Sequence, residues 1–200
     1  MRKIKVALFV ATGMLAASFD PVYAAGPGGM TRNLSDGSAF AYMGQKRTVG
    51  APFAQVLFCT RNPKECSDNE GEPVVALEEK AQQQLKAVNL SVNKTMIGKN
   101  DNVGELGGDI WQVNVRSGDC EDFALTKRSR LLALGWSSRA MRIATAFTRS
   151  GEGHAVLVVR TTTGDLVLDN RTNAIKNWRN TDLRWDKIQS DTDPYIWYSL

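Results

Sequence analysis

The strongest local signal in this sequence is a helix that is predicted to begin at a cysteine. Asp119 is expected to be its N-cap, and Asp122, three residues later, the acidic partner of a capping box. An apolar stripe follows before the predicted stop at Gly135, and it consists of Leu125, Leu131, Leu132 and Leu134. Cys120 therefore takes the first helical position, where free backbone N–H groups favour a thiolate and can hold an oxyanion. The alternative is a buried structural cysteine.

The first 24 residues have the pattern of a secretory signal peptide. Three cations precede an apolar run over residues 6–17, and Val22-Tyr23-Ala24 has the small-x-small pattern of a cleavage site. The apolar run is too short to cross a bilayer as a helix. We therefore expect cleavage after Ala24 and a mature protein that is periplasmic or secreted.

The charge of the chain gives little support for a nucleic-acid partner. Half of the formal net charge of +4 lies in residues 1–24, and no run of Lys and Arg alternates with aromatic residues later in the chain. No later segment is long and apolar enough to form a membrane helix. These observations favour a soluble domain whose partner is not a nucleic acid.

The chain after the leader divides into a lead-in and one domain. Residues 25–50 are rich in Gly and small polar residues and are predicted to be extended and poorly ordered, whereas residues 51–200 can form a core. The periodicities predict a helix over 74–97, a loop over 99–109, the helix over 120–134, and antiparallel strands over 139–148, 154–161 and 166–168. Helices followed by an antiparallel sheet define the α+β class.

Cysteine usage leaves one thiol to explain. Cys59 and Cys66 flank a short polar loop that could close into a local disulfide, as expected in an oxidising compartment. Cys120 would then remain unpaired and available as a reagent. The alternatives are a bridge from Cys120 to one of the other two, or a metal site. Three cysteines and one histidine lack the paired spacing of a zinc site.

His154 is the single histidine of the chain and hence the natural base for a cysteine nucleophile. The structural alternative is a histidine without catalytic function. A third group is needed to fix the imidazole tautomer, normally a carboxylate or an amide. Asp169, at the end of the next predicted strand, is the candidate, with Asn170 beside it. Asp165 is explained more simply as a turn residue.

The predicted hairpin supports the pairing of His154 with Asp169 only in part. With a four-residue loop over 162–165, Asp169 faces Val158, on the same side of the sheet as His154. The two side chains would still be offset by four residues, roughly 13 Å at the rise of a strand. A bulge or a longer loop would be needed to bring them together.

Three segments carry this chemistry, namely Gly118-Asp119-Cys120-Glu121-Asp122-Phe123-Ala124, Gly153-His154-Ala155 and Leu168-Asp169-Asn170. Together they resemble the bacterial transglutaminase-like cysteine peptidases, whose best-studied members are LapG-type periplasmic adhesin proteases. The resemblance covers roughly residues 52–178. It implies a papain-like, transglutaminase-type core with Cys120 as nucleophile, His154 as base and Asp169 as the orienting group. The Cys120 backbone N–H would supply part of the oxyanion hole.

The resemblance also implies a role for the acids beside the cysteine. Asp119 and Glu121 match positions that bind Ca²⁺ in the adhesin proteases, and Asp122 is a candidate for a further ligand. Three carboxylates next to Cys120 should raise the pKa of its thiol, and a bound Ca²⁺ would offset them. The alternative needs no metal, because acids in the first turn complement the helix dipole.

These features lead to three functional hypotheses. The first is an exported thiol peptidase that cleaves a protein or peptide, such as a cell-surface protein, through a thioester on Cys120. The second is acyl transfer to an amine on the same triad. The third is a non-catalytic secreted binding module in which the motif is only structural. The resemblance further suggests a membrane receptor as a regulator.

Overall fold

The computed structural model describes residues 41–67, 70–101 and 108–200. The predicted signal peptide and most of the predicted lead-in lie outside these residues. None of the described helices is long and apolar enough to cross a membrane.

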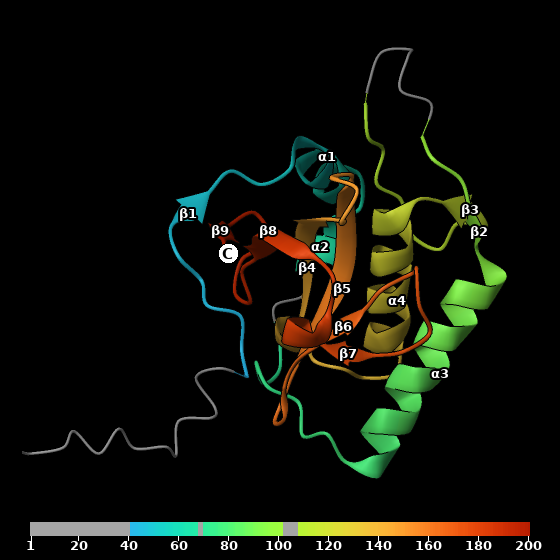
Figure 1. Ribbon diagram of the computed structural model, residues 1–200, viewed down its shortest axis with the longest axis vertical. Helices are drawn as coiled ribbons and strands as arrows, with labels where there is room; N and C mark the ends of the chain where they lie inside the picture. Colours follow the sequence, from blue (N-terminus) through green and yellow to red (C-terminus); the bar gives the residue numbers. More distant parts are fainter. Residues whose placement is uncertain (1–40, 68–69, 102–107) are drawn as a thin grey trace, which may run out of the picture. The chain divides into compact units, whose positions relative to one another are not determined.

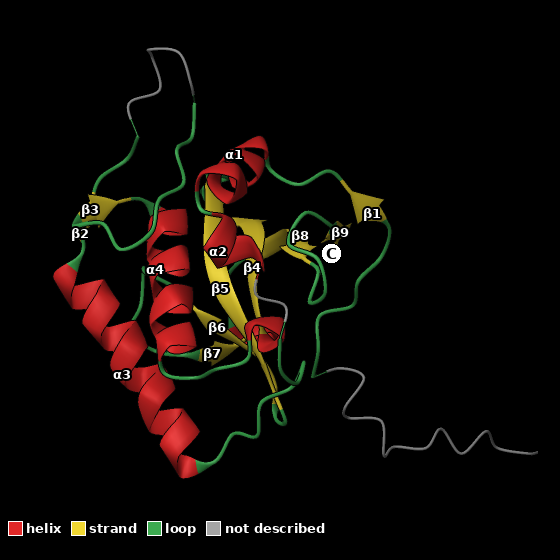
Figure 2. Ribbon diagram, turned by 180° about the vertical axis from the view of Figure 1, so that it is seen from behind, coloured by secondary structure: helices red, strands yellow, loops and turns green. Residues whose placement is uncertain are grey.

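Four α-helices precede most of the sheet, as predicted for an α+β chain. They are α1 (Phe53–Arg61), α2 (Pro63–Ser67), α3 (Glu79–Thr95) and α4 (Cys120–Ala133). Figures 1 and 2 show α4 between α3 and the strands, so that α3 lies on the outside. The α4 helix is therefore buried between other elements along most of its length.

The sheet is antiparallel and has seven strands in the order β1-β9-β8-β4-β5-β6-β7. In chain order these are β1 (Thr48–Val49), β4 (Met141–Phe147), β5 (Gly153–Thr161), β6 (Gly164–Leu168), β7 (Lys176–Asn177), β8 (Arg184–Gln189) and β9 (Trp197–Ser199). A separate parallel pair joins β2 (Ile97–Gly98) to β3 (Ser117–Gly118) just before α4. Short 3₁₀ turns occupy Ser138–Ala140 and Trp178–Asn180.

Both faces of the sheet are covered by apolar side chains. Alternate residues of β5 point to opposite sides, so that Leu157 packs with the helices while Val156 packs with the C-terminal segments. The helix-side core includes Phe58 of α1, Val92 of α3 and Leu131 of α4. The sheet therefore fixes α4, and the cysteine at its start, against β5.

The α4 helix ends where the sequence predicts. Gly135 has a φ of +84°, a conformation that costs glycine no steric strain. Its N–H donates to the carbonyl of Leu132, and the N–H of Trp136 donates to the carbonyl of Leu131. These two bonds form a Schellman motif, which satisfies carbonyls at the end of the helix.

The α3 helix begins later than predicted because Val75 is hydrogen-bonded to the end of β5 instead. Val75 forms a parallel bridge with Thr161 at the end of β5. Its N–H donates to the carbonyl of Arg160, and its carbonyl accepts from the N–H of Thr162. The helix therefore begins at Glu79, and at its other end the chain enters β2 at Ile97.

The β5–β6 hairpin differs from the prediction in its loop length. Thr161 pairs with Gly164, so the loop has two residues rather than four, and Val158 faces Val167 rather than Asp169. Continued by one residue, this register brings Asp169 beside Val156. The offset from His154 falls to two residues, and no bulge is needed.

The chain over residues 41–49 is extended, as predicted, but it is attached to the sheet rather than poorly ordered. β1 pairs with β9, and the side chain of Met43 is 3% exposed. The N–H of Met43 donates to Asp165 at 2.7 Å, and the N–H of Asp165 donates to the carbonyl of Ala41. This segment is therefore an integral part of the described domain.

Asp165 is not a simple turn residue. Its side chain is fully buried and accepts hydrogen bonds from Arg160 and from Arg142, which is itself 1% exposed. A buried charge without a partner is costly, so these contacts allow the carboxylate to remain inside. Asp165 thus joins β4, β5 and the segment over residues 41–49.

Candidate active site

Cys120 is the first residue of α4 and is a free thiol. Its Sγ accepts a hydrogen bond from the backbone N–H of Ala155 in β5 at 3.2 Å, and donates one to Glu121 Oε2 at 3.2 Å. Burial and the neighbouring Glu121 carboxylate raise the pKa of the thiol above its ordinary value, and the Ala155 N–H opposes this shift. The thiol therefore favours its protonated form in the absence of a compensating positive charge.

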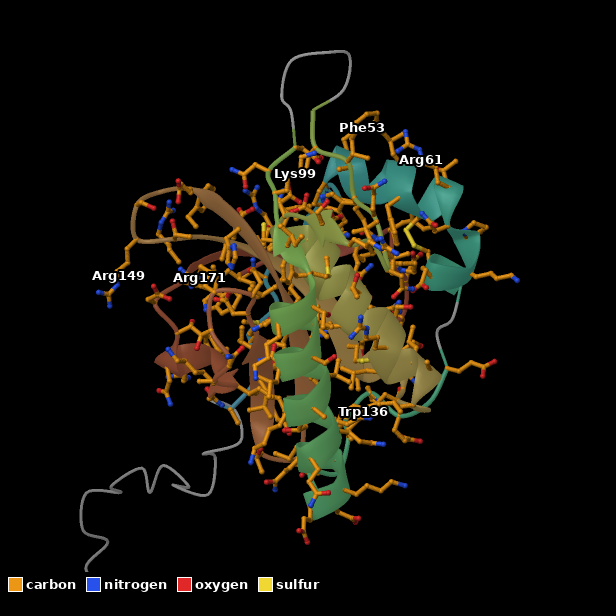
Figure 3. All side chains as sticks on the ribbon, turned by 90° about the vertical axis from the view of Figure 1, so that its right-hand side faces the viewer. Phe53, Arg61, Lys99, Trp136, Arg149 and Arg171 are labelled. Atoms are coloured by element: carbon orange, nitrogen blue, oxygen red, sulfur yellow. A yellow bond between two sulfur atoms is a disulfide. The ribbon has the colours of Figure 1, made fainter. Side chains whose placement is uncertain are left out.

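The other two cysteines are joined in a disulfide. Cys59 in α1 and Cys66 in α2 have Cα atoms 5.5 Å apart, and the bond is yellow in Figure 3, below the label of Arg61. This pairing confirms the local disulfide suggested by the sequence. It also excludes a bridge from Cys120 to either residue.

His154 and Asp169 form a buried pair, although sequence reasoning left their separation open. The imidazole Nε2 lies 2.9 Å from Asp169 Oδ1, and both side chains are 6% exposed. Because Asp169 accepts at Nε2, the other ring nitrogen, Nδ1, remains for a second partner.

Arg171 also contacts this pair, and no local pattern in the sequence predicted it. Its guanidinium donates to Asp169 Oδ2 at 2.9 Å, and its backbone N–H donates to Oδ1 at 2.9 Å. Burial of Asp169 tends to raise its pKa, but the hydrogen bonds from His154 and Arg171 outweigh it and bring the pKa below the ordinary value. Asp169 is therefore an anion at any physiological pH.

Cys120 and His154 line one cavity of about 750 Å³, whereas Asp169, bonded to His154, is not part of its wall. Asn170 and Arg171 line the cavity as well. In the described structure no hydrogen bond joins Cys120 Sγ to the imidazole. Lys99, from the loop after β2, also lines the cavity and is labelled with Arg171 in Figure 3. The cavity is large enough for a short peptide segment and has charged walls.

Of the two hydrogen bonds in the predicted capping box at the start of α4, the one that the Asp119 side chain would accept is absent. The Asp119 side chain makes no capping hydrogen bond, and its Oδ2 instead accepts from the N–H of Asp101 at 3.3 Å. Asp122 Oδ1 accepts from the N–H of Gln112 at 2.7 Å, and a backbone hydrogen bond from Asp119 also stabilises the Asp122 carboxylate. The acids therefore anchor the segments that precede the helix.

Four carboxylates gather beside Cys120. One oxygen from each of Asp101, Asp109, Asp119 and Glu121 lies within 4.8 Å of the others. Asp122, the third acid named from the sequence, is not one of the four. Asp101 and Asp109 were missed because they lie at two ends of a loop and meet only in the folded chain. Their position in a Gly- and Asn-rich loop was the signal available.

The residues in this acidic cluster fit a calcium ion. All four offer the hard oxygen ligands that Ca²⁺ prefers. Asp119 Oδ1 and Glu121 Oε1 are buried and have no hydrogen-bond partner among the described residues. Burial, together with the neighbouring carboxyls of Asp109 and Asp119, raises the pKa of Glu121 to about 10. A divalent cation would relieve this concentration of negative charge.

One buried cation in α4 contributes to none of these contacts. Lys127 is 0% exposed, and its Nζ has no hydrogen-bond partner among the described residues. Burial lowers its pKa to about 7, against an ordinary value of 10.5, and the charge of Asp169 only partly opposes this. Between these two pH values the lysine is protonated in the unfolded chain but not in the folded one. The free energy of unfolding therefore rises with pH because of this group.

Replacing Lys127 with methionine should therefore stabilise the fold. At about pH 6 the free energy of unfolding should rise by about 1–3 kcal/mol, the usual cost of an unsatisfied buried group. The gain should shrink as the pH rises from 7 towards 10.5. Thermal unfolding across this pH range measures the gain in stability. Lys94→Met, on the exposed side of α3, is the control. An equal gain at every pH would contradict this explanation.

A cysteine at the start of a helix, packed against an antiparallel sheet that carries a His–Asp pair, defines a papain-like or transglutaminase-like cysteine proteinase. The model of the family described as bacterial transglutaminase-like cysteine proteinase BTLCP matches residues 45–200. The chain belongs to this family. The predicted family and fold class are therefore confirmed.

Solved structures show the same fold. Calcium-bound LapG of Legionella pneumophila is 24% identical, with a TM-score of 0.51 over 74% of this chain and 81% of that chain. EGTA-treated LapG of the same organism is 23% identical, with a TM-score of 0.50 over 75% of this chain and 80% of that chain. Comparison with curated protein sequences found no match.

Proposed function

We propose that this protein is an exported cysteine peptidase that hydrolyses a peptide bond of a protein substrate through a thioester on Cys120. The observation that carries the proposal is one cavity lined by a free thiol at a helix start and by His154, whose imidazole is paired with the buried Asp169. Membership of a cysteine proteinase family supports the same class of reaction.

In the proposed reaction His154 Nδ1 accepts the thiol proton as Cys120 Sγ attacks the peptide carbonyl carbon. Asp169 holds Nε2–H and stabilises the imidazolium that forms. The oxyanion accepts a hydrogen bond from the backbone N–H of Cys120 at the start of α4. The imidazolium returns the proton to the leaving amine, which departs as the C–N bond breaks. Water, deprotonated by His154, then attacks the thioester carbon; the C–S bond breaks, the acid leaves, and the imidazolium returns the proton to Cys120 Sγ.

We propose that Asp101, Asp109, Asp119 and Glu121 hold Ca²⁺ beside this thiol. One LapG structure is calcium-bound and another is EGTA-treated. The ion would neutralise the carboxylates of Glu121 and Asp119, which raise the pKa of Cys120, and would bind Asp101 and Asp109 to them. Asp122 is not proposed as a ligand, because its carboxylate accepts a hydrogen bond from the backbone N–H of Gln112.

The location and partners of the enzyme are also part of the proposal. The leader over residues 1–24 supports a periplasmic or secreted enzyme. A cell-surface protein as substrate and a membrane receptor as regulator rest on the resemblance to the adhesin proteases alone.

A comparison of new protein N-termini tests the function. Periplasmic extracts would be treated with the wild type or with Cys120→Ala, each with and without EGTA. Termini that need both Cys120 and calcium are expected. Products joined to an added primary amine would instead indicate acyl transfer. A binding module would yield no Cys120-dependent product, and its Cys120 would react with iodoacetamide no faster than a buried thiol.

A further inference from the structure

The loop that carries Asp169 is held by a helix on the far side of α4. β6 ends at Leu168, and Asp169 is the next residue. From α3, Asn93 Nδ2 donates to the backbone carbonyl of Asp169 at 3.1 Å and to that of Thr172 at 3.0 Å. The amide thus contacts the main chain of the very residue whose side chain binds His154.

A second asparagine, one turn earlier in α3, holds the other end of the same loop. Asn89 Nδ2 donates to the carbonyl of Asn173 at 3.1 Å, and the residue is 0% exposed. Residues four apart lie on one face of a helix, so Asn89 and Asn93 form a pair of donors directed at residues 169–173. A buried amide N–H is costly unless it donates a hydrogen bond, and the loop carbonyls accept from the Nδ2 groups of both asparagines.

Movement of the loop main chain would move the Asp169 carboxylate with it. Asp169 Oδ1 accepts the N–H of Arg171, two residues along, so the side chain is fixed to its own loop. The same oxygen lies 2.9 Å from His154 Nε2. A hydrogen bond weakens steeply beyond such distances, so a shift of about 1 Å would break the pair.

We propose that Asn93 is a positioning residue that acts through Asp169, with Asn89 securing the distal end of the loop. The expected effect on kcat rests on the proposed function. The effect of Asn93 on the position of Asp169 beside His154 does not. Because α3 packs against α4, the same helix supports both the segment with the nucleophile and the loop with the orienting carboxylate.

A double-mutant cycle tests this role. In the wild-type background, Asn93→Ala should lower kcat by about 10- to 100-fold, the usual range for a residue that orients a functional group. KM should change little. In an Asp169→Asn background the same change should lower kcat less than about twofold, because its target is already lost. Lys94→Ala, exposed on α3, is the matched control.

A spectroscopic measurement needs no substrate. His154 is the only histidine, so in tag-free protein the downfield imidazole N–H proton that binds Asp169 is a single resonance. It should disappear in Asn93→Ala and Asn93→Asp, both of which lack the amide N–H that donates to the loop. Thermal unfolding of each variant verifies that it is folded.

Two results would overturn the proposal. One is a kcat loss of equal size in both backgrounds, which would indicate a general structural effect. The other is an unchanged imidazole resonance in folded Asn93→Ala and Asn93→Asp. Failure of the proposed function would look different, since Cys120→Ala would then produce the same termini as the wild type.

Discussion

Replacing His154 with alanine should lower kcat/KM for peptide hydrolysis by at least about 10³-fold, because no other histidine can supply the base. The substrate would be a peptide spanning a bond cut in a Cys120-dependent manner. The rate of Cys120 alkylation by iodoacetamide gives a second readout. It should fall near neutral pH, since the imidazole that accepts the thiol proton is lost.

Matched variants separate the two neighbouring candidates for orienting His154. Asp169→Asn should cost about 10²-fold or more in kcat, because the amide can hold the wrong tautomer. Asn170→Ala, which removes a side chain from the same cavity, should cost far less. The opposite order would transfer the orienting role to Asn170. Since the pKa of Asp169 lies below 3.8, Asp169 should cause no loss of activity between neutral pH and about pH 5.

Removing calcium should have the second large effect. EGTA should lower activity at least about tenfold, and added Ca²⁺, but not Mg²⁺, should restore it because the site offers several clustered carboxylates. At a Ca²⁺ concentration 100 times its Kd, the ion should stabilise the fold by about 2.7 kcal/mol. Calorimetric titration and thermal unfolding measure both quantities.

The stabilisation of the fold by Ca²⁺ should depend on pH. Without a cation, the folded protein keeps a proton on Glu121 up to a pKa of about 10, whereas the unfolded chain releases it near 4.5. The stability of the calcium-free protein should therefore fall as the pH rises between these values, and Ca²⁺ should stabilise more at high pH.

Variants of single acids identify the calcium ligands. Asp101→Asn should weaken Ca²⁺ binding, whereas Glu152→Gln, an exposed acid lining the same cavity, should not. An unchanged melting temperature on addition of Ca²⁺, with full activity in EGTA, would rule out the calcium site.

Local signals predicted the nucleophile segment well. The start of α4 at Cys120 and its end at Gly135 follow from residue preferences that act over a few residues. The bonds of Asp119 and Asp122 could not be predicted in the same way. Their carboxylates bind N–H groups of Asp101 and Gln112, segments that only the folded chain brings near.

The His154–Asp169 pair shows how a small error in register changes a site. The sequence Thr-Thr-Gly-Asp at residues 162–165 allows loops of two or four residues, and the two choices move Asp169 by two positions along β5. The two-residue loop is favoured by Gly164, whose φ of +115° suits glycine. A Cβ at this position would also lie 2.6 Å from the carbonyl of Ala41. That contact depends on a segment more than a hundred residues away.

The pairing of β1 with β9 has a consequence for how the protein is made. The N–H of Ser199 donates to the carbonyl of Arg47, so residues near the two ends of the described chain are hydrogen-bonded. A chain leaves the ribosome N-terminus first, so β1 has no strand to pair with until residues 197–199 of β9 are synthesised. Pairings of such long range form slowly. Late completion of the sheet would suit the export proposed here, because a secretory precursor has to stay unfolded until it is translocated.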